Sequence, residues 1–346
     1  MASIKVLLQS VFRKVVELAI VILICILMLD GIIYFTFRNP DSVPSSLASL
    51  MRIVNISAAR PQPAYDPACS VYDFEVNYRF KSGQCRHQSW EFDVTIRGNS
   101  KGFPDDEASL TAPKIVILGD SYAAGWGVEQ GQSFPSHLER ISGKRVLVAA
   151  APSYATGREL ALLDDMDLSA VETVIIQYSE NDAFENFEVF KNEGIAPIHH
   201  MVYRSISKTN LKRKRYLQQP YFPGKYIHLV YLAFQQPTAP ALPSNDSKAE
   251  HLLGIIERSK LADMNDVPIF IVSIYESHKS DQAVIDAVNK RLYASKNSNT
   301  NNLHNRIKTL PTTLHLTGQD YFILDDHLRP SGHRKVAELL NDSLSQ

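Results

Sequence analysis

The sequence predicts an α/β protein: a three-layer α/β/α domain with a central parallel sheet, preceded by one N-terminal transmembrane helix and a small β-rich segment. From residue 113 onward, short apolar runs alternate with segments whose apolar residues recur at helical spacing. Such runs suit strands that are buried on both faces, and the alternation is typical of a parallel sheet covered by helices. Near the N-terminus, one uninterrupted apolar stretch is long enough to cross a bilayer.

The composition is that of a chain that packs a core. Its 346 residues include 36 Lys and Arg against 37 Asp and Glu, so that the formal charge is −1, and apolar residues make up 45%. These values exclude intrinsic disorder, collagen-like repeats and a disulfide-dense small scaffold as descriptions of the whole chain. The balanced charge provides no general attraction to nucleic acid, so no nucleic-acid partner is expected.

The apolar stretch at residues 18–37 predicts a membrane anchor. Asp30 is its only charge, and about twenty residues at roughly 1.5 Å each cross a hydrocarbon core. A buried soluble helix would show a polar face, which this stretch lacks before Asp30. A cleaved signal peptide has a shorter apolar region and a small-x-small site soon after it, and no such site follows Phe37. We therefore expect an N-terminal tail at 1–14 and an uncleaved span at 15–37, with Asp30 reaching the outer interface or meeting a partner helix.

Charges on either side of the span predict its orientation. Lys5, Arg13 and Lys14 precede it, whereas Arg38 and Asp41 follow it closely. Cytoplasmic flanks carry the excess of Lys and Arg. The N-terminus of this single-pass protein is therefore expected in the cytoplasm, and the remaining chain outside it, in the periplasm if the source is bacterial.

Two segments separate the span from the main domain. Residues 38–67 contain five prolines and predict a linker. Residues 68–111 predict a small β-rich unit, because 71–80 and 90–96 alternate apolar and polar side chains. If 71–80 and 86–96 form a simple hairpin, it turns about the Ser-Gly pair at 82–83.

Two cysteines, Cys69 and Cys85, lie beyond the span, while Cys25 lies inside it. In an oxidising compartment the first two could form one bridge. In a single hairpin about residues 82–83 they would not face each other, so the bridge is a hypothesis.

Residues 112–346 are predicted to form the main domain. The runs typical of buried strands are 114–119, 145–151, 173–178 and 268–275. The segments with helical spacing are 133–141, 156–166, 247–264 and 280–294, followed by a final helix from Pro330. In sheets of this kind the chemistry gathers at the carboxyl ends of the strands.

Residues 183–246 interrupt this alternation. They contain paired histidines at 199–200, a basic run at 212–215, many tyrosines and a proline-rich stretch. The segment is either a surface excursion with solvated charges, or a substrate-side lid or a basic patch facing anionic headgroups. The sequence leaves these alternatives open.

The first predicted strand ends at Gly119, Asp120 and Ser121, where a strand-end nucleophile would be presented. A serine after a strand is often only a helix cap, and its neighbours do not form the G-x-S-x-G elbow. The glycines at 125 and 127 miss the dinucleotide-binding spacing. The sequence has no phosphate-binding loop and no common zinc motif, so neither a nucleotide nor a metal is expected.

A serine hydroxyl needs a base to become a nucleophile, and the best candidate is His327. It follows two acids on an irregular loop, ahead of the final helix. An acid two residues before a histidine can turn back to bond one ring nitrogen, which leaves the other nitrogen free to face the serine. His333, in the first turn of that helix, is interpreted as structural.

The third predicted strand ends at Tyr178 and leads to Asn181. Alone, an asparagine in this place would be a turn residue. Beside a nucleophilic Ser121, its amide can instead donate to a developing oxyanion. Ser121, Asn181 and His327 are therefore expected at one edge of the sheet.

Four blocks in this order resemble those of the SGNH/GDSL hydrolase superfamily: VILGDSYAAGWGV, PSYATG, SENDAFEN and DDHLRPSGH, all within residues 112–345. The resemblance implies the flavodoxin-like α/β/α fold of that superfamily. It also implies Ser121 as nucleophile and His327 as general base. The Ser121 backbone N–H and the Asn181 side chain would form part of the oxyanion hole, and Asp182 would brace the turn.

Two positions depart from the superfamily's pattern. Its second block supplies a glycine whose N–H completes the oxyanion hole, whereas this chain has Ser153. A backbone donor survives that replacement, but a positive φ would be strained. Its last block is often D-x-x-H, whereas Leu324 occupies the place of the Asp. Asp325 gives D-x-H, a spacing seen in membrane-associated relatives that include alginate-type O-acetyltransferases. Asp325 is therefore the expected orienting acid, with Asp326 as the alternative.

These residues predict a membrane-anchored, extracytoplasmic serine esterase that hydrolyses a glycan- or lipid-linked acyl ester through a Ser-His-Asp acyl-enzyme. The mechanism requires no metal and no organic cofactor. One alternative is an O-acyltransferase, such as an O-acetyltransferase, that acts on a cell-surface polysaccharide with the same site. The other alternative, suggested by Ser153, is a catalytically degenerate binding or scaffold protein.

Overall fold

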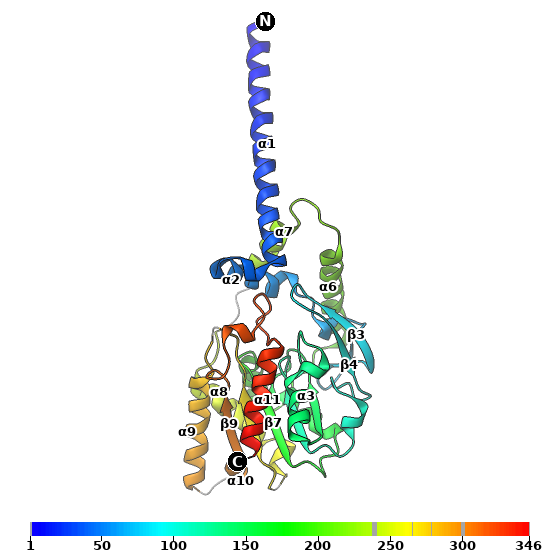
Figure 1. The fold of residues 1–346 in the computed structure, drawn as a ribbon, viewed down its shortest axis with the longest axis vertical. Coiled ribbons are helices and arrows are strands. Elements are labelled where there is room, and N and C mark those ends of the chain that lie inside the picture. Colours follow the sequence, from blue (N-terminus) through cyan, green and yellow to red (C-terminus); the bar gives the residue numbers. More distant parts are fainter. Residues whose placement is uncertain (1, 237–240, 265, 278, 299–301, 346) are drawn as a thin grey trace. The chain divides into compact units, whose positions relative to one another are not determined.

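The structure, a computed structural model, describes residues 2–236, 241–264, 266–277, 279–298 and 302–345. Its central feature is a five-stranded parallel sheet with the order β6-β5-β7-β8-β9 (Figure 1). The strands are β5 (Ile115–Gly119), β6 (Val146–Ala150), β7 (Thr173–Tyr178), β8 (Ile269–Ser273) and β9 (Ile307–Pro311). The first four coincide with the predicted apolar runs.

Side chains at alternate positions of each strand point to opposite faces of the sheet, as the pleat requires. In β5, Val116 and Leu118 belong to one hydrophobic cluster, whereas Ile115 and Ile117 belong to another. The first cluster includes residues of α4 (Thr156–Ala161), α5 (Asp182–Asn192), α8 (Asn245–Glu257), α9 (Gln282–Ser298) and α10 (Asn302–Arg306). The second includes residues of α3 (Phe134–Ser142) and α11 (Pro330–Leu344). The predicted three-layer arrangement is confirmed.

The edge strand β9 is absent from the sequence-based prediction. Of its five residues only Ile307 is buried, and the strand ends at Pro311. A half-exposed strand shows neither a continuous apolar run nor a clean alternation, so its periodicity is weak. A terminal proline fits an edge strand because no further neighbour needs its missing N–H.

The β-rich segment forms two short hairpins in place of one simple hairpin over 71–96. β1 (Ser70–Asp73) pairs with β2 (Asn77–Phe80), and β3 (Gly83–Gln88) pairs with β4 (Asp93–Gly98), both antiparallel. The chain turns after β1 because the Asp73 carboxylate accepts hydrogen bonds from the backbone N–H groups of Glu75 and Val76, at 2.8 and 3.0 Å. This Asx turn divides a stretch whose alternation alone predicts one strand.

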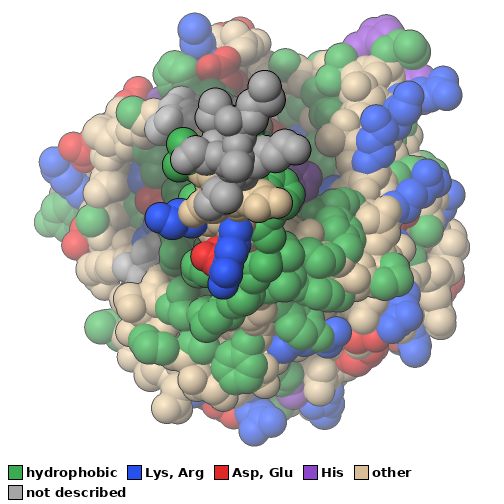
Figure 2. Space-filling view, turned by 90° about the horizontal axis from the view of Figure 1, so that it is seen from above, with side chains coloured by type: hydrophobic (Ala, Val, Ile, Leu, Met, Phe, Trp, Pro, Cys, Tyr) green, Lys and Arg blue, Asp and Glu red, His purple; other side chains and the backbone are tan. Residues whose placement is uncertain are grey.

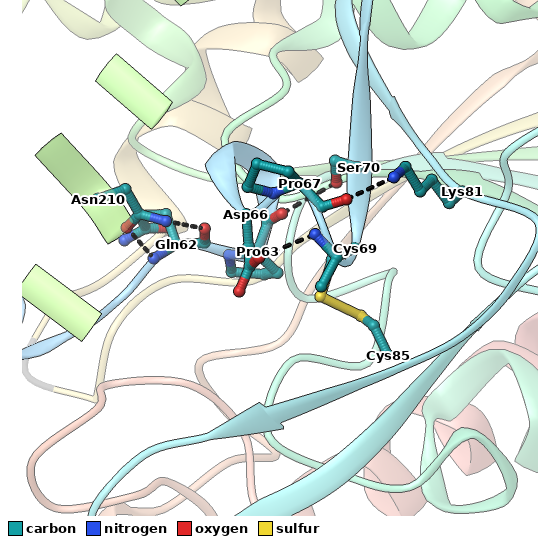
Figure 3. Close-up of a disulfide and its surroundings, with 10 residues drawn as sticks. Gln62, Pro63, Asp66, Pro67, Cys69, Ser70, Lys81, Cys85 and Asn210 are labelled. Carbon is teal, nitrogen blue, oxygen red and sulfur yellow. Dashed lines mark hydrogen bonds between the residues drawn. A yellow bond between two sulfur atoms is a disulfide. The ribbon is translucent and has the colours of Figure 1, made fainter. Parts of the chain in front are cut away.

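The additional turn brings the two cysteines together. In the β1–β2 pair Ser70 lies opposite Phe80, and the Lys81 backbone N–H donates to the carbonyl oxygen of Cys69 at 2.8 Å. Cys69 and Cys85 form a disulfide, with their Cα atoms 5.2 Å apart (Figure 3). The bridge therefore links the start of the first hairpin to the second.

The chain divides into two compact units. The helical unit comprises residues 1–60, 213–238 and 323–325, and the sheet unit comprises residues 61–212, 239–322 and 326–346. The predicted excursion is split between them. It supplies α5 and the first part of α6 (His200–Gln218) to the sheet unit, and α7 (Lys225–Phe234) to the helical unit.

The helical unit begins with α1 (Ala2–Arg38) and continues with α2 (Ser45–Val54) and a π-helical turn, Asn55–Ala59. Within α1, Leu7–Arg38 is long and apolar enough to cross a membrane. The expectation of a linker at 38–67 is wrong, because most of that segment is folded. In α2, Ala48, Met51 and Val54 are buried at a spacing of three residues, which places them on one helix face.

Asp30, the one charge of the predicted span, is fully buried within the helical unit. Its Oδ1 accepts hydrogen bonds from the backbone N–H groups of Tyr226 and Ile227, at 2.8 and 3.0 Å. N–H groups in the first turn of a helix lack intrahelical partners, and the helix dipole favours a carboxylate there. Asp30 thus meets a partner helix, which is one of the two environments expected.

Candidate active site

Ser121 follows β5 directly, at the carboxyl edge of the sheet. The strand ends at Gly119, where a Cβ atom would lie 2.6 Å from Oε1 of Gln177 and 2.7 Å from Cβ of Ala123. Gln177, on the neighbouring β7, accepts hydrogen bonds from the backbone N–H groups of Asp120 and Ala123, at 3.0 and 3.2 Å. The turn that presents Ser121 is therefore fixed by a glycine and by a side chain of the adjacent strand.

The structure brings Ser121 and His327 together. Oγ of Ser121 and Nε2 of His327 are 2.7 Å apart, which is a hydrogen-bond distance. The two side chains are nearly buried, with exposed fractions of 7% and 8%. In this geometry the serine hydroxyl can donate to the imidazole, and the same nitrogen can take up the proton when the oxygen attacks a carbonyl.

Two hydrogen bonds to main-chain carbonyl oxygens hold the loop that carries His327. The Phe322 N–H donates to the His327 carbonyl oxygen at 2.8 Å, and the Tyr122 hydroxyl donates to the Asp326 carbonyl oxygen at 3.2 Å. Asp326 has φ 44°, a conformation that non-glycine residues rarely adopt. The bend lies directly before His327.

Two aromatic rings flank the imidazole of His327. The ring of Trp126 is stacked on it, with centroids 4.9 Å apart and an interplanar angle of 19°, and the ring of Tyr122 lies 5.0 Å away. Trp126 stands between Gly125 and Gly127, whose φ angles of 74° and 78° are readily available to glycine. Sequence reasoning missed both rings as parts of the site, and the Gly-Trp-Gly run is the only sign of them.

The second hairpin covers the outer side of this stack. His87 of β3 packs edge-on against Trp126 with centroids 4.5 Å apart, and Phe92 lies 5.4 Å from Phe322. Phe92, Val94, Trp126 and Phe322 form a separate hydrophobic cluster. The β3–β4 hairpin therefore packs against Trp126, on whose ring the imidazole of His327 is stacked.

The two candidate acids contact different partners. Oδ1 of Asp326 lies 3.4 Å from Nδ1 of His327, whereas a charge-assisted hydrogen bond is typically about 2.8 Å long. Asp325 is fully buried, and its Oδ1 accepts a hydrogen bond from Arg60 at 3.3 Å. The Asp326–His327 contact is thus longer than a charge-assisted hydrogen bond. Asp325 remains the predicted orienting acid, with Asp326 as its alternative.

The residues around Asp325 are tied into the helical unit by side chains of the first 60 residues. Arg52 donates to the carbonyl oxygen of Ile323 at 2.8 Å, and Asn55 donates to that of Leu324 at 2.9 Å. Together with the Arg60 contact, these bonds fix three successive residues of the loop. The sequence contains no sign of them, because the partners are about 270 positions apart.

Asn181 follows β7, and its side chain is exposed. The side-chain oxygen Oδ1 of Asn181 contacts the Ser179 hydroxyl. That hydroxyl donates a hydrogen bond to Oδ2 of Asp120 at 2.7 Å. Asp120 accepts a further bond from the Tyr122 N–H at 2.9 Å. Burial raises the pKa of Asp120, and these hydrogen bonds act in the opposite direction. The network connects the end of β5 to the end of β7 and so positions Asn181 relative to Ser121.

Two more carboxyl groups are buried near this network. Asp182 accepts a hydrogen bond from the Ser179 N–H at 3.2 Å, as a residue that braces the turn should. Glu159 of α4 is fully buried. Burial raises the pKa of both groups well above the ordinary value, and the nearby charges of Asp182 and Asp120 raise the pKa of Glu159 further. The carboxyl groups of Asp182 and Glu159 therefore keep a proton to higher pH than ordinary carboxyl groups do.

Ser153, at the place of the superfamily's glycine, has φ 64°. This is the left-handed region, where a non-glycine residue is strained, so the strain anticipated from the sequence is present. The guanidinium of Arg158 donates to the Ser153 carbonyl oxygen and pairs with Glu185, and the Tyr78 hydroxyl donates to the Pro152 carbonyl oxygen. These contacts hold the loop in a shape that glycine would adopt freely.

His333 occupies a structural position. Its Nδ1 accepts a hydrogen bond from the Phe134 N–H at 3.1 Å, and its ring stacks on that of Phe134. Burial lowers the pKa of His333 to about 3. A neutral imidazole that joins α11 to α3 agrees with the structural interpretation of this residue.

The side chains of Asp325, Asp326 and His327 are of the types that bind metal ions. However, Nε2 of His327 faces Ser121 and Nδ1 faces Asp326. An imidazole with an acid at one nitrogen and a hydroxyl at the other is arranged for proton transfer.

No family model matches the chain, and no curated protein matches it. Several solved structures resemble it. One is described as a lipolytic protein of the G-D-S-L family from Desulfitobacterium hafniense, which is 13% identical; 66% of this chain and 98% of that chain are covered, with a TM-score of 0.39. An extracellular lipase from Streptomyces rimosus is 14% identical, with 66% and 98% covered and a TM-score of 0.31.

A further similar structure is a salicylyl-acyltransferase from a tetracycline biosynthetic pathway. It is 12% identical, with 78% of this chain and 59% of that chain covered and a TM-score of 0.35. At these values the likeness says nothing about the substrate or the reaction of this chain. These structures are described as a GDSL-family lipolytic protein, an extracellular lipase and an acyltransferase.

Proposed function

We propose that this chain is a serine esterase of the SGNH/GDSL type, anchored in a membrane by α1 and with its catalytic domain outside the cytoplasm. The observation that carries the proposal is the 2.7 Å contact between Oγ of Ser121 and Nε2 of His327. A serine and an imidazole in this contact, at the carboxyl edge of a parallel sheet, are what a base-activated nucleophile requires. The substrate is an acyl ester carried by a glycan or a lipid.

Acylation begins when Oγ of Ser121 attacks the ester carbonyl carbon and Nε2 of His327 takes the hydroxyl proton. The resulting oxyanion accepts hydrogen bonds from the backbone N–H groups of Ser121 and Ser153 and from the amide of Asn181. The tetrahedral intermediate then collapses. The alcohol leaves with the proton that His327 returns to its oxygen.

Deacylation repeats these steps with water in place of Ser121. His327 takes a proton from the water, the hydroxide oxygen attacks the acyl carbon, and the proton passes back to Ser121 as the carboxylic acid leaves. An orienting acid, Asp325 in the predicted assignment, stabilises the imidazolium that forms twice in each cycle. The sequence and the residues described here require no metal or organic cofactor for these steps.

Replacing Ser121 by alanine tests the proposal. We expect the esterase kcat of Ser121→Ala to fall by at least about 10³-fold, because the covalent route is lost. Ser205→Ala, an exposed serine on α6, is the matched control and should keep full activity. Equal thermal unfolding of the two variants would show that the loss is not one of folding. Full activity in Ser121→Ala would refute the proposal.

An O-acyltransferase is the second candidate, and the low exposure of Ser121 and His327 favours it. An acyl-enzyme that water reaches poorly lasts longer, which gives a glycan hydroxyl time to act as the acceptor. The test is to add sugar acceptors to a reaction with a chromogenic acyl donor. Acylated sugar formed in preference to free acid would assign the chain to transfer, and free acid alone would assign it to hydrolysis.

A further inference from the structure

The helical unit contains more apolar and aromatic surface than one membrane span needs. Its exposed large side chains outside α1 are, with their exposed fractions, Leu50 (38%), Ile53 (56%), Tyr221 (50%), Phe222 (38%), Tyr231 (57%) and Phe234 (71%). An exposed apolar surface of this kind marks a site of contact with a partner or a membrane. Figure 2 views the molecule from the end to which α1 extends, and hydrophobic side chains lie at the centre of that view.

We propose that α7, together with α2 and the segment at 219–224, lies in the interfacial layer of the membrane that α1 enters, on its extracytoplasmic side. The inference rests on the proposed membrane anchoring by α1. The partner is a lipid surface that contains anionic headgroups. Three independent observations support it: the attachment of α7 to α1, the clustering of tyrosines, and the distribution of charge.

The first observation is the attachment through Asp30. This carboxylate accepts hydrogen bonds from the Tyr226 and Ile227 backbone N–H groups, so that the start of α7 is fixed to α1 eight residues before Arg38. At about 1.5 Å per residue, this is roughly 12 Å from the end of α1. A carboxylate and the polar start of a helix are too costly for the centre of a bilayer, so they belong near its interface.

The second observation is a group of aromatic rings around this attachment. Tyr34 of α1 lies 5.1 Å from Tyr226 and 6.2 Å from Tyr221, and Tyr221 stacks on Tyr226. The guanidinium of Arg38 lies over the ring of Tyr34, at 5.8 Å. Tyrosine is enriched where membrane-spanning helices leave the hydrocarbon core, because its ring is apolar and its hydroxyl is polar.

The third observation is charge. Within residues 31–60 and 213–236 the only acid is Asp41. The exposed basic residues there are Arg38 and Arg215, and the half-buried ones are Arg52, Arg60, Arg213 and Lys214. An excess of positive charge beside exposed apolar side chains is the pattern of a helix that lies in an anionic interface. A contact between two copies of this chain would bring these like charges together, which disfavours that alternative.

Depth-dependent quenching in vesicles tests the proposal on the full chain. With Cys25→Ser as background and the Cys69–Cys85 disulfide kept oxidised, a single NBD probe is attached after Phe234→Cys. The matched control is Leu314→Cys, which is 81% exposed and lies in the sheet unit. The vesicles contain phosphatidylglycerol and a lipid with a nitroxide at the headgroup. We expect strong quenching of the probe at 234 and none at 314.

A third probe separates this inference from the anchoring on which it rests. The chain with its own Cys25 labelled reports whether α1 is in the bilayer, through quenching by a nitroxide deep in the acyl chain. If Cys25 is quenched but the probe at 234 is not, the inference is overturned while the anchor stands. If neither is quenched, the anchor itself is refuted.

Lipid charge and copy number provide two further controls. In vesicles of phosphatidylcholine alone we expect weaker quenching at 234, and equal quenching in both compositions would overturn the assignment to anionic headgroups.

Dilution of the protein into more lipid should leave the quenching of the probe at 234 unchanged. Shielding of the probe at 234 that disappears on dilution would assign the surface to a second copy instead and overturn the proposal.

Discussion

At the scale of single residues, the base His327 has an acid beside it in sequence and another two positions away. The 3.4 Å contact to Asp326 is longer than a strong hydrogen bond, whereas the D-x-H spacing favours Asp325. We expect Asp325→Asn to lower kcat by about 10²–10⁴-fold, because loss of the orienting carboxylate leaves the imidazole in the wrong tautomer. Asp326→Asn should cost less than about tenfold. The reverse order of the two losses would make Asp326 the orienting acid.

The indole of Trp126 is stacked on the imidazole at 4.9 Å, so it also faces the imidazolium that forms during catalysis. A cation over an aromatic face is stabilised by about 0.5–2 kcal/mol. We therefore expect Trp126→Leu to lower kcat by roughly 2- to 30-fold and to move the acid limb of the kcat/KM profile to lower pH, because the protonated base loses stabilisation. Trp126→Phe, which keeps an aromatic ring, should retain much of the wild-type kcat and most of the wild-type pH profile.

The other tryptophan, Trp90, supplies the matched control for this prediction. Trp90→Leu should leave the pH profile unchanged. An unchanged profile in Trp126→Leu, with kcat reduced, would show that the indole acts by packing alone.

At the scale of elements, the edge strand β6 is protected by carboxylates in place of a further strand. The Val146 N–H donates to Glu139 at 2.8 Å, and the Val148 N–H donates to Asp105 at 2.9 Å. Acidic side chains at such an edge satisfy its backbone donors and discourage pairing with another chain. Burial raises the pKa of Asp105 to about 6, although its hydrogen bonds with backbone N–H groups oppose the rise.

This raised pKa makes stability depend on pH in a defined direction. Between about pH 4 and 6 the folded chain holds a proton on Asp105 that the unfolded chain has lost, so stability falls as the pH rises through this window. We expect Asp105→Asn to remove that fall, so that the variant gains stability relative to the wild type between pH 4 and pH 7. Urea denaturation at several pH values measures it. A constant difference between the two proteins across this range would contradict the shift.

The elements also show which parts of the fold were predictable from sequence. The strands β5, β6, β7 and β8 were, because a strand buried on both faces must be apolar throughout. A simple hairpin over 71–96 does not form, because an Asx turn at Asp73 divides the alternating stretch 71–80 into two strands. The strand β9 was not predicted, because its partly exposed side chains need not be apolar and so leave no apolar run in the sequence.

At the scale of the whole molecule, long-range contacts explain the remaining errors. The expected linker at 38–67 is folded, and part of the expected excursion joins it in the helical unit. One contact between α1 and α7 is made by Asp30, whose carboxylate accepts hydrogen bonds from backbone N–H groups almost 200 residues away. Nothing in local periodicity reports such a contact, although an isolated charge in an apolar span is itself a sign that a partner exists.

The candidate site was more accessible to sequence reasoning than the packing around it. Ser121, Asn181 and His327 follow from strand ends and motif order, because the geometry of a parallel sheet collects its strand ends at one edge. The rings of Trp126 and Tyr122 and the buried Glu159 do not follow, because their roles depend on what packs against them.

Labelling of the full-length protein by a fluorophosphonate tests the reactive pair most directly. We predict one phosphonate per chain, mapped to Ser121 by mass spectrometry. The labelling rate should fall as the pH is lowered through about 6.5, the ordinary pKa of a histidine, and should be nearly abolished in His327→Gln. A folded protein that remains unlabelled at Ser121, or that is labelled equally fast without the imidazole, would contradict this account.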